Sequence, residues 1–163
     1  MFRLSKETDK VSIKHLLKKC FGDFPIKMGA LENLDGRYLI YRNMDTGEIL
    51  GMTGLIWSDS LEALEVDWSC VDPNARRQGI MHDLFKRICG LTDERIYCSC
   101  WRTASNEKCN MSSLMKDFNF KEVVHSSKTW VAPYNCTCVI DECIYFPHDG
   151  VGACSCWEDL YMR

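Results

Sequence analysis

The pattern of apolar and polar residues along the chain predicts a mixed α/β protein. Helical spacing of apolar residues predicts helices over residues 8–21, 24–34, 80–91 and 106–118. Alternating or short apolar runs predict strands over residues 1–5, 37–43, 48–57, 61–71, 95–101, 120–130 and 156–163. This order indicates an antiparallel meander that leads into a parallel crossover through a helix, and such crossovers are right-handed.

The first and third helices each show one apolar face. The first is expected to begin near Thr8 or Asp9 and to bury Ile13, Leu16, Leu17, Cys20 and Phe21. In the third, the buried stripe is expected to contain Ile80, Leu84, Ile88 and Leu91. The solvent-facing residues of the third helix are then His82, Asp83, Lys86 and Arg87.

The strand over residues 61–71 combines apolar and polar faces. Strict alternation places Leu64, Val66, Trp68 and Cys70 on one face. It places Glu65, Asp67 and Ser69 on the other, where these polar side chains would converge on one cleft. Pro73 ends the strand because it has no N–H for a sheet ladder.

The loop between this strand and the third helix carries Arg76, Arg77 and Gly79. The first turn of a helix has unpaired backbone N–H groups and a partial positive charge, and both suit a phosphate group. Gly79 would let the backbone approach a ligand closely, while the arginines add positive charge. A plain helix start with solvated arginines is the alternative reading of the same residues.

The loop resembles the pyrophosphate-binding motif of the GNAT superfamily of N-acetyltransferases, (Gln/Arg)-x-x-Gly-x-(Gly/Ala). The family often precedes it with Val-x-Pro, as in the stretch Val71-Asp72-Pro73-Asn74-Ala75-Arg76. Arg76 and Gly79 match the first two fixed positions, whereas Met81 departs from the small residue expected last. The order of elements is also similar, as is "SSLMKDFNFKEV", where Asn119 replaces the customary Gly before Phe120.

The resemblance implies the GNAT fold, a mixed, mostly antiparallel sheet of six or seven strands flanked by about four helices. Residues 1–163 would form a single acetyltransferase domain, with a Cys-rich insertion at about 133–156 between the last two strands. The implied function is acetyl transfer from acetyl-CoA to a primary amine of unknown identity, by direct attack in a ternary complex. A non-catalytic acyl-CoA-binding or regulatory module with the same fold is the alternative.

The resemblance also implies roles for individual residues. Backbone groups of Ser69, Cys70 and Val71 would pair with the pantetheine arm of the cofactor. The pyrophosphate would be held by Arg76, Arg77, Gln78, Gly79, Ile80 and Met81. Asn106 resembles an Asn that many relatives turn toward the pantetheine.

For catalysis, Glu65 lies six residues before Val71, where the family's general base usually falls, and Asp67 is a second candidate. A solvated strand face is the alternative for both carboxylates. The Tyr that often protonates the departing thiolate is replaced by Met115, so no general acid is predicted.

Composition narrows the class of protein. The 163 residues have a formal net charge of −3, which gives no indication of a nucleic-acid or membrane partner. Charged residues appear early and no apolar run approaches the ~20 residues of a membrane span, so a cytoplasmic protein is expected. The partner is expected to be a small-molecule or peptide amine, and a homodimer is left open.

The chain contains 11 cysteines, and those before residue 110 mostly occupy positions that look buried. Five more lie close together near the C-terminus: Cys136, Cys138, Cys143, Cys154 and Cys156. With His148 they could form a zinc site, but Cys-x-Cys spacing is equally that of small packing thiols on a strand. Packing is favoured, and no metal ligand is predicted.

Overall fold

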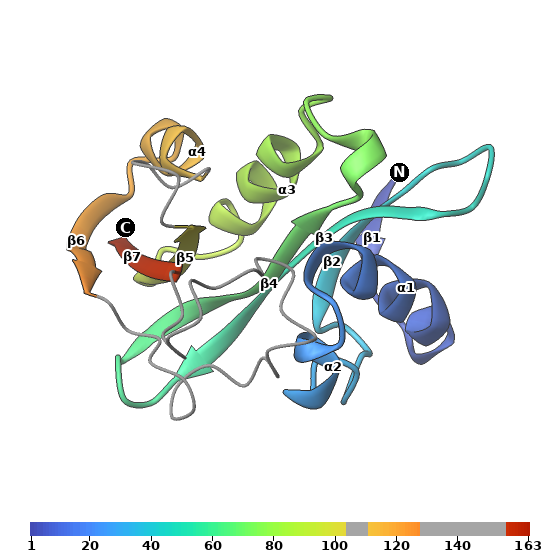
Figure 1. Cartoon of the computed structure of the whole chain (residues 1–163), viewed down its shortest axis with the longest axis horizontal. Coiled ribbons are helices and arrows are strands. Elements are labelled where there is room, and N and C mark those ends of the chain that lie inside the picture. The colour runs from blue at the N-terminus through green and yellow to red at the C-terminus, as the bar shows by residue number, and fades with distance from the viewer. Residues whose placement is uncertain (104–110, 128–155) are drawn as a thin grey trace, which may run out of the picture. The chain divides into compact units, whose positions relative to one another are not determined.

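The structure, a computed structural model, describes residues 1–103, 111–127 and 156–163. This part of the chain contains seven strands and four α-helices. The chain divides into two units, Met1–Glu94 and Arg95–Arg163. Figure 1 traces the elements of each unit.

The first unit is built on antiparallel strands that pair in chain order. They are β1 (Phe2–Leu4), β2 (Tyr38–Arg42), β3 (Ile49–Ser58) and β4 (Ala63–Val71). Its helices are α1 (Lys10–Phe21), α2 (Phe24–Lys27) and α3 (Ile80–Cys89), with short 3₁₀ helices at Glu7–Asp9 and Pro73–Ala75. The predicted hairpin over residues 37–57 is confirmed by the pairing of β2 with β3.

Apolar clusters cover both faces of these strands. On one face α1 packs its stripe of Ile13, Leu16, Leu17 and Cys20 against strand residues that include Tyr38, Ile40 and Met52. On the other face α3 contributes Ile80 and Leu84, which pack near Leu39, Tyr41 and Val71. A Cβ at Gly51 would lie 2.8 Å from Ile80 Cγ2, so this glycine allows α3 to approach β3 closely. The packing of the α1 stripe confirms the predicted inner face of the first helix.

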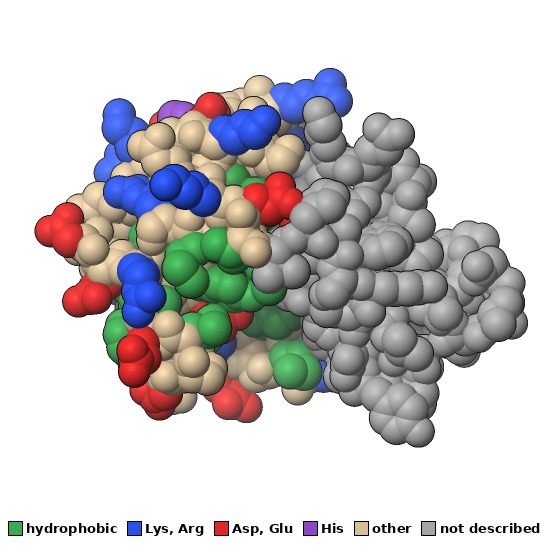
Figure 2. Space-filling view, turned by 90° about the vertical axis from the view of Figure 1, so that its left-hand side faces the viewer, with side chains coloured by type: hydrophobic (Ala, Val, Ile, Leu, Met, Phe, Trp, Pro, Cys, Tyr) green, Lys and Arg blue, Asp and Glu red, His purple; other side chains and the backbone are tan. Residues whose placement is uncertain are grey.

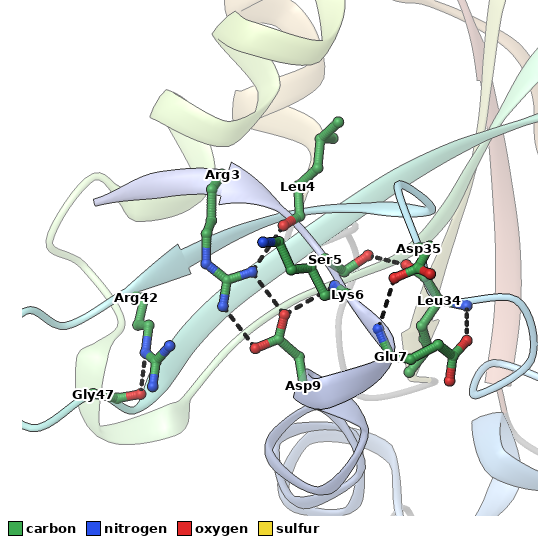
Figure 3. Close-up of polar contacts among 10 residues, drawn as sticks. All are labelled: Arg3, Leu4, Ser5, Lys6, Glu7, Asp9, Leu34, Asp35, Arg42 and Gly47. Atoms are coloured by element: carbon green, nitrogen blue, oxygen red, sulfur yellow. Dashed lines mark hydrogen bonds and ion pairs between the residues drawn. The ribbon is translucent and has the colours of Figure 1, made fainter.

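Polar contacts fix the entry into α1 (Figure 3). The guanidinium of Arg3 donates to both carboxylate oxygens of Asp9, at 2.6 and 2.7 Å, and Asp9 also accepts from the Lys6 amide. The hydrogen bonds from Arg3 hold the pKa of Asp9 below its usual value. Glu7 accepts from the Leu34 amide at 2.8 Å, which ties the same segment to the loop before β2.

The second unit contains β5 (Ile96–Thr103), α4 (Ser112–Asp117), β6 (Lys121–Ser127) and β7 (Cys156–Met162). β7 lies between β5 and β6 and is antiparallel to both. Asn119 ends α4 with a left-handed φ of 61°, and the Phe120 amide donates to Met115 O at 2.9 Å. The expected tolerance of Asn119 for this backbone conformation is confirmed.

Two helix predictions in the first unit differ from the structure. The helix expected over residues 24–34 ends at Lys27, because Gly29 and Asn33 adopt left-handed φ values of 80° and 50°. The third helix ends at Cys89, so Leu91 is 72% exposed rather than part of the buried stripe. Figure 2 shows further hydrophobic side chains at the surface among charged ones. The expected insertion at about 133–156 lies outside the described residues, Cys156 excepted.

Candidate active site

β4 carries both candidate catalytic residues, and a β-bulge interrupts it. Met52 of β3 lies opposite Cys70, whereas Gly54 lies opposite Asp67. Two β4 residues, Trp68 and Ser69, therefore face the single β3 residue Thr53. Trp68 has a φ of 35°, which a bulky side chain rarely adopts.

The bulge corrects the face assignment made from strict alternation. Residues opposite each other on paired strands share a face, so Asp67 and Cys70 both lie on the face of Met52, covered by α1. The Ser69 hydroxyl instead lies 2.6 Å from the Thr53 hydroxyl on the other face. The predicted grouping of Glu65, Asp67 and Ser69 is therefore wrong for Ser69, and both Cys70 and Trp68, which packs against Phe21 of α1, belong with the carboxylates.

Asp67 is engaged in an ion pair. Its carboxylate accepts from Arg37 Nε at 2.9 Å, and the residue is 7% exposed. Arg37 is itself held by the carbonyl oxygens of Gly29 and Glu32, at 2.8 and 2.9 Å. The buried carboxylate is thus already occupied by a guanidinium and is less accessible to an amine from solvent. By exposure, Glu65 is the better candidate base, because it is only partly buried whereas Asp67 is buried.

Glu65 lies two residues before Asp67 and so on the same face of β4. It is partly buried, and its cross-strand partner Ile56 is 39% exposed. Glu65 therefore combines a carboxylate with an adjacent apolar surface that is open to solvent. This combination suits an amine that carries an apolar part.

At the end of β4, Val71 directs its backbone N–H and C=O groups away from β3. The Asp72 amide donates to Leu50 O at 2.8 Å, and antiparallel pairs alternate between bonded and non-bonded. Cys70 therefore directs its backbone groups at β3, while those of Val71 point away from it. Of the three strand residues predicted to pair with pantetheine, the geometry favours Val71 and disfavours Cys70.

The loop from Arg76 to Gly79 is exposed and ends in a preformed donor group. Arg77 and Gly79 adopt left-handed φ values of 63° and 78°, and the first bond of α3 is Asp83 N to Gly79 O at 3.0 Å. Within the described part of the chain, no acceptor reaches the amides of Gln78, Gly79, Ile80 and Met81. A Cβ on Gly79 would meet nothing within 4 Å, so the space beside these amides is open.

Met81, which departs from the family motif, packs with the apolar cluster around Ile80 and Leu84. Its side chain is therefore partly buried against this cluster, and its backbone amide stays with the others at the start of α3. The departure at this position leaves the donor group intact.

A cysteine that the sequence pattern assigned only to the core also reaches this region. Cys20 Sγ donates to Val71 O at 3.5 Å, and Arg76 Nε donates to the same oxygen at 3.4 Å. A hydrogen bond from Cys70 lowers the pKa of the Cys20 thiol, while the bond to Cys20 and burial raise the pKa of Cys70. No motif marks Cys20, because a thiol in a helical stripe looks like any small apolar residue.

Two other predicted positions are not part of the described site. Asn106 lies outside the described residues, and Met115 is fully buried in the second unit. Five cysteines before residue 110 are buried, as expected: Cys20, Cys70, Cys89, Cys98 and Cys100. Within the described ranges, no three metal-ligating side chains come together. Nor does any described helix have the length and apolar character needed to cross a bilayer.

Comparisons with known proteins agree with this geometry. The sequence profile of a family described as "Acetyltransferase (GNAT) family" matches residues 10–114. No curated protein sequence matches the chain. The structure is similar to a GNAT-family acetyltransferase from Bacillus cereus, with a TM-score of 0.66, 14% identity, and coverage of 100% of this chain and 95% of that one.

Two further solved structures have named substrates. The ribosomal-protein-S18-alanine N-acetyltransferase of Escherichia coli has a TM-score of 0.64 and 17% identity, with 99% and 91% of the two chains covered. The diaminobutyrate acetyltransferase of Paenibacillus lautus, in complex with its substrate and coenzyme A, has a TM-score of 0.59 and 18% identity, with 99% and 92% covered. At such identities the likeness shows the fold alone, and the fold class predicted from the sequence is confirmed.

Proposed function

The chain belongs to the GNAT acetyltransferase family, and we propose that it transfers an acetyl group from acetyl-CoA to a primary amine by direct attack in a ternary complex. The family membership makes it an acyltransferase that uses acetyl-CoA. The residue roles and the nature of the acceptor are part of the proposal.

The observation that carries the proposal is the open row of amides from Gln78 to Met81 at the start of α3. Their N–H groups and the helix dipole favour the pyrophosphate of the cofactor. Arg76 and Arg77 are exposed beside this row and add mobile positive charge. The outward-facing backbone of Val71 then continues the binding surface along the pantetheine arm.

Glu65 acts as the general base in this proposal. It takes a proton from the bound ammonium group, and the resulting amine nitrogen attacks the acetyl carbonyl carbon. A C–N bond forms and the C–S bond breaks, and the second proton lost by the nitrogen goes to the departing thiolate, so coenzyme A leaves as a thiol. Asp67 stays paired with Arg37 and shapes the site without accepting the proton. No described residue is assigned as the acid.

The acceptor is proposed to be a cationic small-molecule or peptide amine with an apolar portion. Glu65 supplies the negative charge and Ile56 the apolar contact across the strand pair. The proposal treats residues 1–163 as one catalytic domain. It also retains a cytoplasmic location without nucleic-acid or membrane partners, in line with the net charge of −3.

Calorimetric titration with coenzyme A tests the cofactor site, and thiol release from acetyl-CoA with a panel of amines tests the reaction. We expect binding that weakens by roughly a hundredfold when Arg76 and Arg77 are both changed to alanine. The variant Lys10→Ala/Lys14→Ala removes two exposed charges from α1 and serves as a matched control. No binding at millimolar coenzyme A would refute the proposal, whereas binding without turnover on any amine would favour a non-catalytic module.

A further inference from the structure

The bulge in β4 divides the strand into two halves and determines which face of the sheet the side chains of each half occupy. Before it, Glu65 and Asp67 lie on the face covered by α1. After it, Val71 lies on the opposite face, in the cluster with Ile80 and Leu84. In a regular strand Glu65 and Val71 are an even number of residues apart and would share a face. The bulge therefore turns the carboxylates to the other side of the sheet from the Val71 side chain.

Contacts on both faces hold this irregular point. On the α1 face the ring of Trp68 packs edge-on against Phe21, with ring centroids 5.8 Å apart. On the α3 face the hydroxyl groups of Thr53 and Ser69 lie 2.6 Å apart. Thr53 is 0% exposed and is the single residue opposite the bulge, so its hydroxyl has no access to bulk water.

The second half of β4 is held independently of this pair. The Asp72 amide bonds to Leu50 O, and Cys20 Sγ contacts Val71 O. The first half has its own ladder with β3, from Ala63 to Asp67. Loss of the Thr53–Ser69 bond therefore acts at the bulge that joins the halves and changes the orientation of Glu65 relative to Val71. The partly buried hydroxyl of Ser69 would also be left without its partner, which favours a shift of the strand.

We propose that Thr53 is a positioning residue for acetyl transfer: its hydroxyl holds Ser69, and with it the bulge that orients the Glu65 carboxylate relative to the cofactor edge at Val71. The inference rests on the proposed function, because it assigns Thr53 a role in orienting the proposed base. Small displacements of a reacting group lower the rate strongly while leaving distant binding contacts unchanged.

The test compares Thr53→Val, which removes the hydroxyl and keeps the branched shape, with Thr53→Ser, which keeps the hydroxyl. We expect Thr53→Val to lower kcat about tenfold while the Kd for coenzyme A changes less than about twofold. Thr53→Ser should restore most of the lost kcat. The acceptor used is the amine that gives the highest turnover with the unaltered protein in the panel described above.

Ser5→Ala is the matched control. Ser5 is also buried, and its hydroxyl donates to Leu34 O and accepts from the Tyr38 amide, away from the bulge. This variant should lower the melting temperature without lowering kcat. If Thr53→Val and Ser5→Ala change kcat equally, or if Thr53→Ser is as slow as Thr53→Val, the positioning role is wrong. Absence of turnover by the unaltered protein on every amine would instead overturn the proposed catalytic function.

Discussion

The ammonium of Lys19 lies 2.9 Å from the Asp72 carboxylate and joins the last turn of α1 to the loop that precedes α3. Asp72 also accepts from the Asn74 amide at 3.0 Å, which caps the 3₁₀ helix at Pro73–Ala75. The loop that presents Arg76 and Gly79 is thus anchored by a buried carboxylate at its start. The bond from Lys19 lowers the pKa of Asp72.

This lowered pKa predicts how stability depends on pH. A carboxyl group with a lower pKa in the folded state stabilises the protein above its unfolded pKa, and the contribution is lost as the pH falls through the folded value. Asp72→Asn should therefore melt roughly 3 °C lower than the unaltered protein at pH 7. The difference should shrink below about pH 4, near the unfolded pKa of an aspartate. Thermal unfolding from pH 3 to 7 measures it, and a constant difference would contradict the ion-pair explanation.

Gly79 offers a direct test of the cofactor loop, because its backbone φ of 78° disfavours any side chain. Gly79→Ala should cost about 1 kcal/mol of stability and also weaken coenzyme A binding, since the added methyl group projects into the open space beside the amides.

Gly36→Ala is a close control for this change. Gly36 has a φ of 76°, and a Cβ there also meets nothing within 4 Å, but it lies in the loop before β2. Chemical denaturation should show similar losses of stability for the two variants, and calorimetry should show weaker binding for Gly79→Ala alone. If the two variants have equal affinities for coenzyme A, the loop at Gly79 does not bind the cofactor.

Glu65→Gln tests the proposed base. The amide cannot accept the proton of the ammonium group, so kcat at pH 7 should fall at least roughly a hundredfold. The Kd for coenzyme A should stay nearly constant, because Glu65 lies in the first half of β4, before the bulge. Stopped assays of thiol release with the best amine acceptor measure the rate. Unchanged turnover would remove Glu65 from the mechanism.

Asp67→Asn should behave differently from Glu65→Gln. It leaves the guanidinium of Arg37 without its charged partner in a site where Asp67 is 7% exposed. Breaking such a pair costs about 3 kcal/mol of stability. Urea denaturation should therefore show the larger loss for Asp67→Asn, whereas the larger loss of kcat belongs to Glu65→Gln. The reverse order would make Asp67 the base.

Much of the first unit could be predicted from local patterns. The apolar stripe of α1 and the strands of the β2–β3 hairpin depend on periodicity and turn residues, and these are visible in a single sequence. The left-handed backbone of Asn119 could also be expected, since few residue types adopt that conformation easily and Asn is one of them. The loop at Arg76 and Gly79 was found because its residue types and spacing match a family motif.

The site details that sequence could not supply depend on contacts between distant segments. The bulge at Trp68 and Ser69 contains no glycine, and it lies opposite Thr53, a residue of another strand. The pairing of Asp67 with Arg37 joins residues 30 positions apart in the sequence. Alternation alone therefore assigned Trp68, Ser69 and Cys70 to the wrong faces, and it could not show that Asp67 is paired with Arg37.

The thiol of Cys20 gives the final prediction, because its pKa is lowered by the hydrogen bond from Cys70. Cys70→Ala removes that bond and should move the pH midpoint for alkylation of Cys20 by iodoacetamide upward. Cys89→Ala removes another buried thiol, on α3, and should leave the midpoint unchanged. Mass spectrometry of the peptide that contains Cys20, sampled from pH 6 to 10, follows the reaction. If both variants shift the midpoint equally, the Cys20–Cys70 bond does not set the reactivity of Cys20.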